Sequence, residues 1–104
     1  MTDAKHPAVA ALVAAINAGD RAAFLDQLAP GATLSDDGRD RELDDWIDRE
    51  IFTVGGRIDI ESQDDSGLDL VARFRNDTWG AMRTKWHFTL DGSGKIVRID
   101  TGQA

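Results

Sequence analysis

Residues 16–38 read INAGDRAAFLDQLAPGATLSDDG, and this stretch decides the fold. Gly19 supplies a stop for the helix before it, and Asp20 can cap the helix after it. Pro30-Gly31 breaks the second helix, and a strand over residues 32–36 follows and ends in Asp36. The stretch therefore predicts a helix end, a short second helix, a sharp turn and a strand that delivers an aspartate.

The segments around this stretch have the apolar periodicity of helices with one buried face. Before Gly19, apolar side chains recur at i, i+3, i+4 and i+7, and comparable stripes mark a second and a third helix. Gly55-Gly56 then ends the helical region. The stripes consist of Val9, Leu12, Val13 and Ile16, of Phe24, Leu25 and Leu28, and of Leu43, Trp46, Ile47 and Ile51.

The chain after Gly56 is typical of strands, because apolar and polar residues alternate with a period of two. Four strands can be placed in this way. The side chains expected on their inner face are Ile58 and Ile60, then Leu68, Leu70, Ala72 and Phe74, then Met82, Trp86, Phe88 and Leu90, and finally Val97 and Ile99.

The loop at residues 91–94, Asp-Gly-Ser-Gly, predicts a four-residue hairpin between the last two strands. A hairpin of this length fixes which residues face one another, because the side-chain period leaves little freedom of register. The expected cross-strand pairs are Leu90 with Lys95, Phe88 with Val97, Trp86 with Ile99, and Lys85 with Asp100.

Three N-terminal helices followed by a run of antiparallel strands resemble the NTF2-like superfamily, which includes nuclear transport factor 2, the ketosteroid isomerases and the SnoaL-type polyketide cyclases. The resemblance covers residues 1–104 as a single domain and lies in the order of the elements. It implies an α+β fold, a cone in which N-terminal helices pack on a curved antiparallel sheet.

Composition narrows the range of functions. The net charge of −7 argues against nucleic acid or an anionic membrane as a partner. The chain has no cysteine, only His6 and His87 could supply imidazole ligands, and no spacing suggests a metal site or a nucleotide loop. We therefore expect no metal and no cofactor. The segment before the first helix lacks the positive charge of a signal peptide, which predicts a cytoplasmic protein.

A cone of this kind leaves an apolar pocket at its open end. We expect a small apolar or amphipathic molecule to bind there, with Trp46 and Trp86 the foremost contacts because each carries an N–H that needs a partner. The alternative is that these side chains only fill the core. The expected ligand-binding residues are Trp46, Phe52, Phe74, Met82, Trp86 and Phe88.

Asp36 is the candidate catalytic residue, because it shares a strand face with Leu34 and points inward if Leu34 does. A carboxylate at the rim of an apolar pocket can act as a general base, and the resemblance places Asp36 where the isomerases keep theirs. A second interpretation makes Asp36-Asp37-Gly38 a turn favoured by local geometry alone. Both interpretations stay open at this point.

The isomerases stabilise the oxyanion of the reaction with two hydrogen-bond donors, and this sequence has no counterpart of either. Alignment puts Leu12 and Trp86 at the positions of those donors, and the chain has no tyrosine. One such donor can contribute about 3 kcal/mol to transition-state stabilisation. Steroid isomerisation is therefore rejected, whereas isomerisation, dehydration or cyclisation of another carbonyl compound remains possible.

The outer face of the predicted sheet is basic. His87 points outward if Trp86 points inward, and it joins Arg73, Arg75, Arg83 and Lys85 there. One interpretation is a solvated face balanced by neighbouring acids. The other is a homodimer through this convex face, or a protein-association module, as the resemblance implies.

Overall fold

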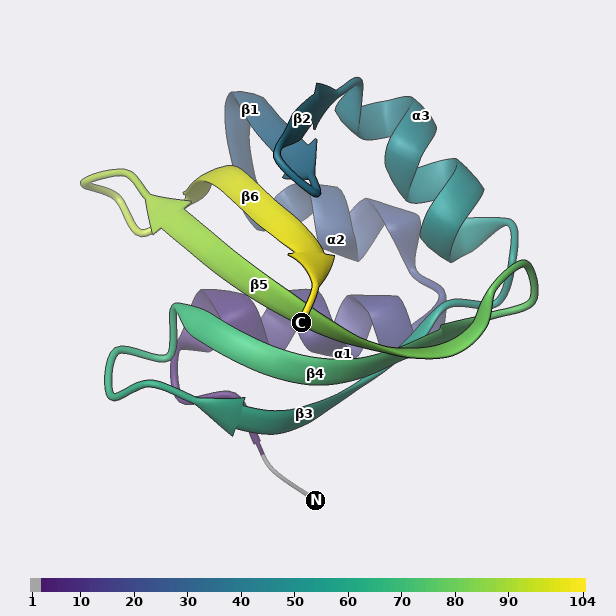
Figure 1. The fold of residues 1–104 in the computed structure, drawn as a ribbon. Coiled ribbons are helices and arrows are strands. Elements are labelled where there is room, and N and C mark those ends of the chain that lie inside the picture. Colours follow the sequence, from purple (N-terminus) through teal and green to yellow (C-terminus); the bar gives the residue numbers. More distant parts are fainter. Residues whose placement is uncertain (1–2) are drawn as a thin grey trace.

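The computed structural model describes residues 3–104. One six-stranded sheet, with strand order β2-β1-β6-β5-β4-β3, carries the helices on one side (Figure 1). The elements are α1 (Pro7–Ala18), α2 (Arg21–Asp26), β1 (Leu28–Asp36), β2 (Arg39–Arg41), α3 (Leu43–Ile47), the π-helical turn η1 (Asp48–Phe52), β3 (Arg57–Gln63), β4 (Asp69–Asn76), β5 (Gly80–Leu90) and β6 (Ile96–Gln103). The α+β class and the order of helices before the strand meander are as expected.

The boundary between the first two helices lies where the sequence predicts it. Gly19 ends α1 in the left-handed conformation at φ 67°, which a glycine adopts without a steric penalty. Asp20 caps α2 by accepting a hydrogen bond from the backbone N–H of Ala23 at 3.0 Å. However, α2 is shorter than predicted: it ends at Asp26, because Leu28 already pairs with Ile96 of β6.

The sheet is mixed, whereas the sequence predicted an antiparallel one. Strands β3 to β6 form the expected antiparallel meander, but β1 runs parallel to β6. Alternation along a single strand does not reveal which distant strand lies beside it, so the parallel pair could not be deduced. This pairing places the end of β1, with Asp36, next to Thr101 in the middle of the sheet.

The predicted register of the β5–β6 hairpin is wrong by two residues. Phe88 lies opposite Ile99 and Trp86 opposite Thr101, while Lys85 faces Gly102 and not Asp100. The shift has two causes. Leu90 pairs with Ile96, so the loop has five residues and not four, and a β-bulge between this pair and the Thr89–Arg98 pair leaves Val97 as a further extra residue. As a result Ile96 is fully buried, and Val97 is only half-buried.

The core fills the space between the helices and the inner face of the sheet. In Figure 1, α1 lies behind β3 to β5, and α3 stands beside β1 and β2. In the described residues, no helix is long and apolar enough to cross a membrane. The largest fully buried side chains are Phe24, Phe88, Leu12, Ile16, Leu34, Ile47, Ile51, Ile96, Ile99 and Val9.

Candidate functional site

A cavity of about 300 Å³ lies against the inner face of the sheet, where α3 and η1 approach the ends of β1 and β6. A volume of this size lies at the small end of the range for ligand pockets. We call it the inner cavity. Its lining residues are Asp36, Asp37, Arg41, Trp46, Glu50, Phe74, Trp79, Met82, Thr84, Trp86, Thr101, Gly102 and Gln103.

Asp36 is the last residue of β1 and contributes a carboxylate to the cavity wall. It lies opposite Arg39 in the β1–β2 hairpin, whereas Asp37 and Gly38 form the turn itself, with φ values of 51° and 82°. Positive φ at both central residues is typical of a tight hairpin turn. The indole Nε1–H of the buried Trp46 donates a hydrogen bond to Asp36 Oδ2 at 3.0 Å.

Trp86 forms the floor of the cavity from β5. Its indole Nε1–H donates to Thr84 Oγ1 at 2.8 Å, and that hydroxyl donates to the backbone carbonyl of Ala72 at 3.1 Å. The Trp46 and Trp86 rings meet edge to face with centroids 6.3 Å apart, which is a favoured geometry for an aromatic pair. The floor is therefore a fixed aromatic surface with its polar atoms satisfied.

The structure brings five of the seven predicted site residues to the inner cavity: Asp36, Trp46, Phe74, Met82 and Trp86. The other two lie elsewhere. Phe52 packs edge to face against Phe24, with ring centroids 5.5 Å apart, and Phe88 is fully buried beside Trp86. Phe88 belongs to the core, and Phe52, which is half-buried, packs against the core from η1, so neither side chain lines the cavity.

Sequence reasoning missed Glu50 and Trp79. Trp79 lies in the turn between β4 and β5, is 63% exposed, and donates its indole Nε1–H to Glu50 Oε2 at 2.9 Å. The turn is held by Asn76, whose Oδ1 accepts the backbone N–H of Trp79 at 2.8 Å. An exposed tryptophan in a turn is the one signal that could have pointed to this residue.

The charged residues that line the cavity are mainly acidic. The lining contains three carboxylates, those of Asp36, Asp37 and Glu50. It contains one guanidinium, that of Arg41 on the exposed strand β2. Asp37 Oδ1 accepts the backbone N–H of Gln103 at 2.9 Å, which fixes this carboxylate against β6. Within residues 3–104 no group of three or more His, Asp or Glu side chains has the arrangement of a metal site.

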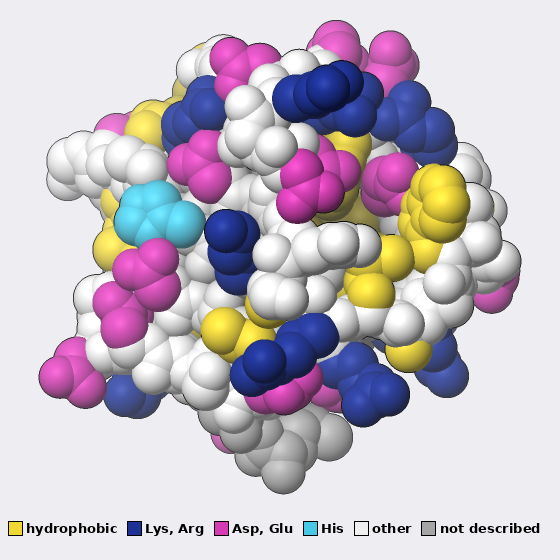
Figure 2. All heavy atoms as spheres, viewed as in Figure 1, with side chains coloured by type: hydrophobic (Ala, Val, Ile, Leu, Met, Phe, Trp, Pro, Cys, Tyr) yellow, Lys and Arg dark blue, Asp and Glu magenta, His cyan; other side chains and the backbone are white. Residues whose placement is uncertain are grey.

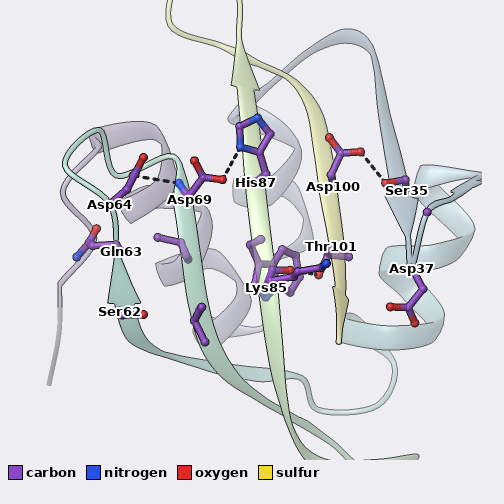
Figure 3. A pocket seen from close by; sticks show the side chains of 14 residues that line it. Ser35, Asp37, Ser62, Gln63, Asp64, Asp69, Lys85, His87, Asp100 and Thr101 are labelled. Atoms are coloured by element: carbon purple, nitrogen blue, oxygen red, sulfur yellow. Dashed lines mark hydrogen bonds and ion pairs between the residues drawn. The ribbon is translucent and has the colours of Figure 1, made fainter. Parts of the chain in front are cut away.

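A second, larger and more open hollow of about 870 Å³ lies on the opposite face of the sheet, and we call it the outer-face groove (Figure 3). A row of polar residues crosses it through the register of β4, β5, β6 and β1. His87 Nδ1 lies 2.6 Å from Asp69 Oδ1, and Ser35 Oγ–H donates to Asp100 Oδ1 at 2.6 Å. Figure 2 shows basic and acidic side chains interspersed over this face of the molecule.

Asp100 lines the groove, and the pKa of its carboxyl is lowered, as is that of Asp64. The hydrogen bond from Ser35, followed by that from Arg98 Nε at 2.9 Å, holds the pKa of the Asp100 carboxyl below the usual value, against the opposing effect of burial. His87 points outward, as the alternation in β5 predicts. The side chains that line this groove are mostly polar or charged, whereas the rings of Trp46, Phe74 and Trp86 line the inner cavity, which makes the inner cavity the better candidate for an apolar ligand.

Neither the models of known protein families nor the sequences of curated proteins match this chain. Solved structures do match in shape. An NTF2-like protein of unknown function from Cytophaga hutchinsonii aligns with a TM-score of 0.78 at 13% identity, over 100% of this chain and 93% of that one. A putative polyketide cyclase from Sinorhizobium meliloti aligns with a TM-score of 0.73 at 18% identity, over 90% of this chain and 92% of that one.

A Δ5-3-ketosteroid isomerase from a Mycobacterium species also aligns, with a TM-score of 0.72 at 16% identity, over 90% of this chain and 88% of that one. These likenesses define the class of fold. The chain adopts the NTF2-like fold, an α+β architecture with an open, mixed sheet. At such low identities the comparisons speak for the fold, and function has to be argued from the site.

Proposed function

We propose that the inner cavity binds a small apolar or amphipathic molecule. The observation that carries this proposal is the cavity itself, in which Trp46, Phe74 and Trp86 surround a space of about 300 Å³ with the Asp36 carboxylate in its wall. Apolar walls with a few fixed polar groups are the usual design of a small-molecule site. The names of two structural neighbours, a putative polyketide cyclase and a ketosteroid isomerase, agree with a fold used for small organic molecules.

Occupying the cavity with a side chain tests this proposal. Naphthylmethanol, an uncharged aromatic alcohol, is titrated into the protein by calorimetry. Met82→Trp is expected to abolish binding because the larger ring fills the space, and Met82→Leu, which nearly conserves volume, is expected to retain it. Equal binding by both variants would contradict the proposal.

A second candidate function is catalytic, with Asp36 as a general base. In this reaction Asp36 takes a proton from the carbon beside a carbonyl group and returns it to another carbon or to an oxygen, so that isomerisation, dehydration or cyclisation of the substrate results. Support comes from its place in the cavity wall. If the hypothesis is right, Asp36→Asn loses turnover of a carbonyl substrate while its melting temperature is unchanged or raised. Turnover retained by the variant would rule it out.

A third candidate is self-association, as a homodimer, through the outer face. Arg73, Arg83 and Lys85 lie on the β4–β5 side of this face, and Asp100 lies across the groove from them. In a twofold contact the cations of one copy would lie against carboxylates of the other, such as Asp100. Light scattering after size-exclusion chromatography tests this. Arg73→Glu with Arg83→Glu should give a monomer, with Arg49→Glu on η1 as the control, and an unchanged mass would contradict it.

A further inference from the structure

We propose that the molecule bound in the inner cavity offers a hydrogen-bond donor at its polar end, and that this donor is a protonated amine. This inference rests on the ligand site proposed above and adds the chemical class of the ligand. It follows from which polar atoms of the lining are already engaged and which remain free.

The three indole N–H groups of the lining are all engaged within the protein. Trp46 donates to Asp36 at 3.0 Å, Trp79 to Glu50 at 2.9 Å, and Trp86 to Thr84 at 2.8 Å. An indole has one N–H and no acceptor. None of these tryptophans can therefore donate to a ligand unless it gives up its present bond.

The hydroxyl donors of the lining are engaged as well. Thr84 Oγ1–H donates to the carbonyl of Ala72 at 3.1 Å, and Thr101 Oγ1–H donates to the carbonyl of Lys85 at 3.0 Å. Each hydroxyl has a single proton to give. The remaining side-chain donors, Arg41 and Gln103, belong to exposed residues at the rim.

Acceptor capacity remains on the carboxylates of the lining, among which Asp37 has its Oδ1 held by the backbone N–H of Gln103. Asp36 Oδ2 is held by Trp46, whereas no donor in residues 3–104 bonds to Asp36 Oδ1. Glu50 Oε2 is held by Trp79, and its other oxygen lies 3.8 Å from Arg49 Nε, beyond hydrogen-bonding distance. A ligand carboxylate or phenolate would meet three negative groups here, Asp36, Asp37 and Glu50, and few donors, whereas an ammonium group could bond to the free oxygen of Asp36 or Glu50.

The aromatic walls favour the same ligand. A cation that lies over the face of a tryptophan is attracted by the ring, and the attraction grows when water is excluded. Trp46 and Trp86 present rings within the cavity, and Trp79 presents an exposed ring at its edge. Carboxylates together with aromatic rings suit an amine with an apolar body better than a neutral hydrocarbon.

Three naphthalene compounds that share one apolar body test the inference: naphthylmethylamine, naphthylmethanol and naphthoate. Their dissociation constants are measured by calorimetry at neutral pH, at low and at moderate salt. We expect the amine to bind at least about tenfold more tightly than naphthoate, since hydrogen bonds to charged groups are stronger than neutral ones. The alcohol should lie between the two.

Variants separate local recognition from the overall negative charge. Asp36→Asn and Glu50→Gln should each reduce the preference for the amine several-fold, and both keep an amide oxygen for the indole N–H so that the fold is retained. Asp59→Asn removes the same charge from exposed β3, outside the cavity, and should leave the preference unchanged. Thermal melts of all three variants verify that they are folded.

The outcomes are distinguishable. If the three compounds bind equally, or naphthoate binds most tightly, the inference is overturned while the proposed ligand site stands. If the preference for the amine survives in both cavity variants, or falls equally in Asp59→Asn, recognition by Asp36 and Glu50 is overturned. If none of the compounds binds, the proposed site fails together with the inference.

Discussion

The indole of Trp46 donates its Nε1–H to Asp36 Oδ2 at 3.0 Å, and this bond joins the first turn of the α3 helix to the end of β1. Trp46 is 5% exposed, so its N–H has little access to water as an alternative partner. The bond orients the carboxylate in the cavity wall and leaves Oδ1 for a ligand. One pair of residues thus combines a structural contact with a group that can recognise a molecule.

Substitutions at Asp36 should separate these two roles. Asp36→Ala leaves the indole N–H of Trp46 without an acceptor, and we expect the free energy of unfolding to fall by about 1–3 kcal/mol. Asp36→Asn keeps an acceptor oxygen and should stay within about 0.5 kcal/mol of the wild type. Urea denaturation measures both. Equal losses in the two variants would show that the carboxylate charge, and not the hydrogen bond, supports the fold.

Trp79 should matter more for binding than for stability. Because its ring is 63% exposed, Trp79→Ala should change the free energy of unfolding by less than about 1 kcal/mol. Binding of naphthylmethylamine should weaken several-fold, since an aromatic pair contributes about 0.5–1.5 kcal/mol beyond area burial. Trp79→Phe retains a ring and is the matched control. A variant that binds as well as the wild type would remove Trp79 from the site.

The outer-face groove predicts a pH dependence of stability. The pKa of Asp100 is lowered in the folded state, chiefly by the hydrogen bond from Ser35. A lowered folded pKa contributes stability above the unfolded pKa of about 3.9, and this contribution is lost as the pH falls through the folded value. Ser35→Ala removes the largest cause, so its acid-induced loss of stability should be smaller than that of the wild type.

Urea denaturation between about pH 6 and pH 2.5 tests this dependence. The difference in unfolding free energy between wild type and Ser35→Ala should narrow as the pH falls. The effect is reduced by solvent, because the side chain of Asp100 is 37% exposed. A difference that stays constant over this range would refute the role of the Ser35 hydrogen bond.

Gly56 should tolerate no side chain. A Cβ there would lie 2.9 Å from Ile51 Cα and 3.1 Å from Ile51 O, and this backbone belongs to the buried end of η1. We expect Gly56→Ala to lower the free energy of unfolding by about 1–3 kcal/mol, as overpacking does. Gly92→Ala, where a Cβ meets nothing within 4 Å, is the control. Equal melting temperatures for the two variants would contradict this packing.

Much of the fold could be predicted because local signals and tertiary structure agree. Local sequence alone determines several features that the structure contains. They are the helix end at Gly19, the helix cap at Asp20, and the alternation of buried and exposed residues in β4 and β5. The shared face of Leu34 and Asp36 follows from the same period of two. This alternation is enough to predict that Asp36 lies in the cavity wall, while the chemical role of Asp36 stays a prediction.

The remaining features depend on contacts between segments that are distant in the chain. The five-residue loop and the bulge at Val97 each add one residue without disturbing the apolar composition of β6, so the predicted register is wrong. The bond between Trp79 and Glu50 joins residues 29 positions apart, and no periodicity links them. The parallel pairing of β1 with β6 is of the same kind. These long-range contacts also complete the inner cavity.

The most direct test of the ligand site is a titration of the ¹⁵N-labelled protein with naphthylmethylamine, followed by NMR. The chain has three tryptophans, whose indole N–H signals can be assigned by Trp→Phe substitution. We predict that the indole signals of Trp46 and Trp79 shift on binding, while the backbone amides of Val71 and His87 in the outer-face groove do not. Shifts confined to that groove, or no shifts at all, would contradict the account.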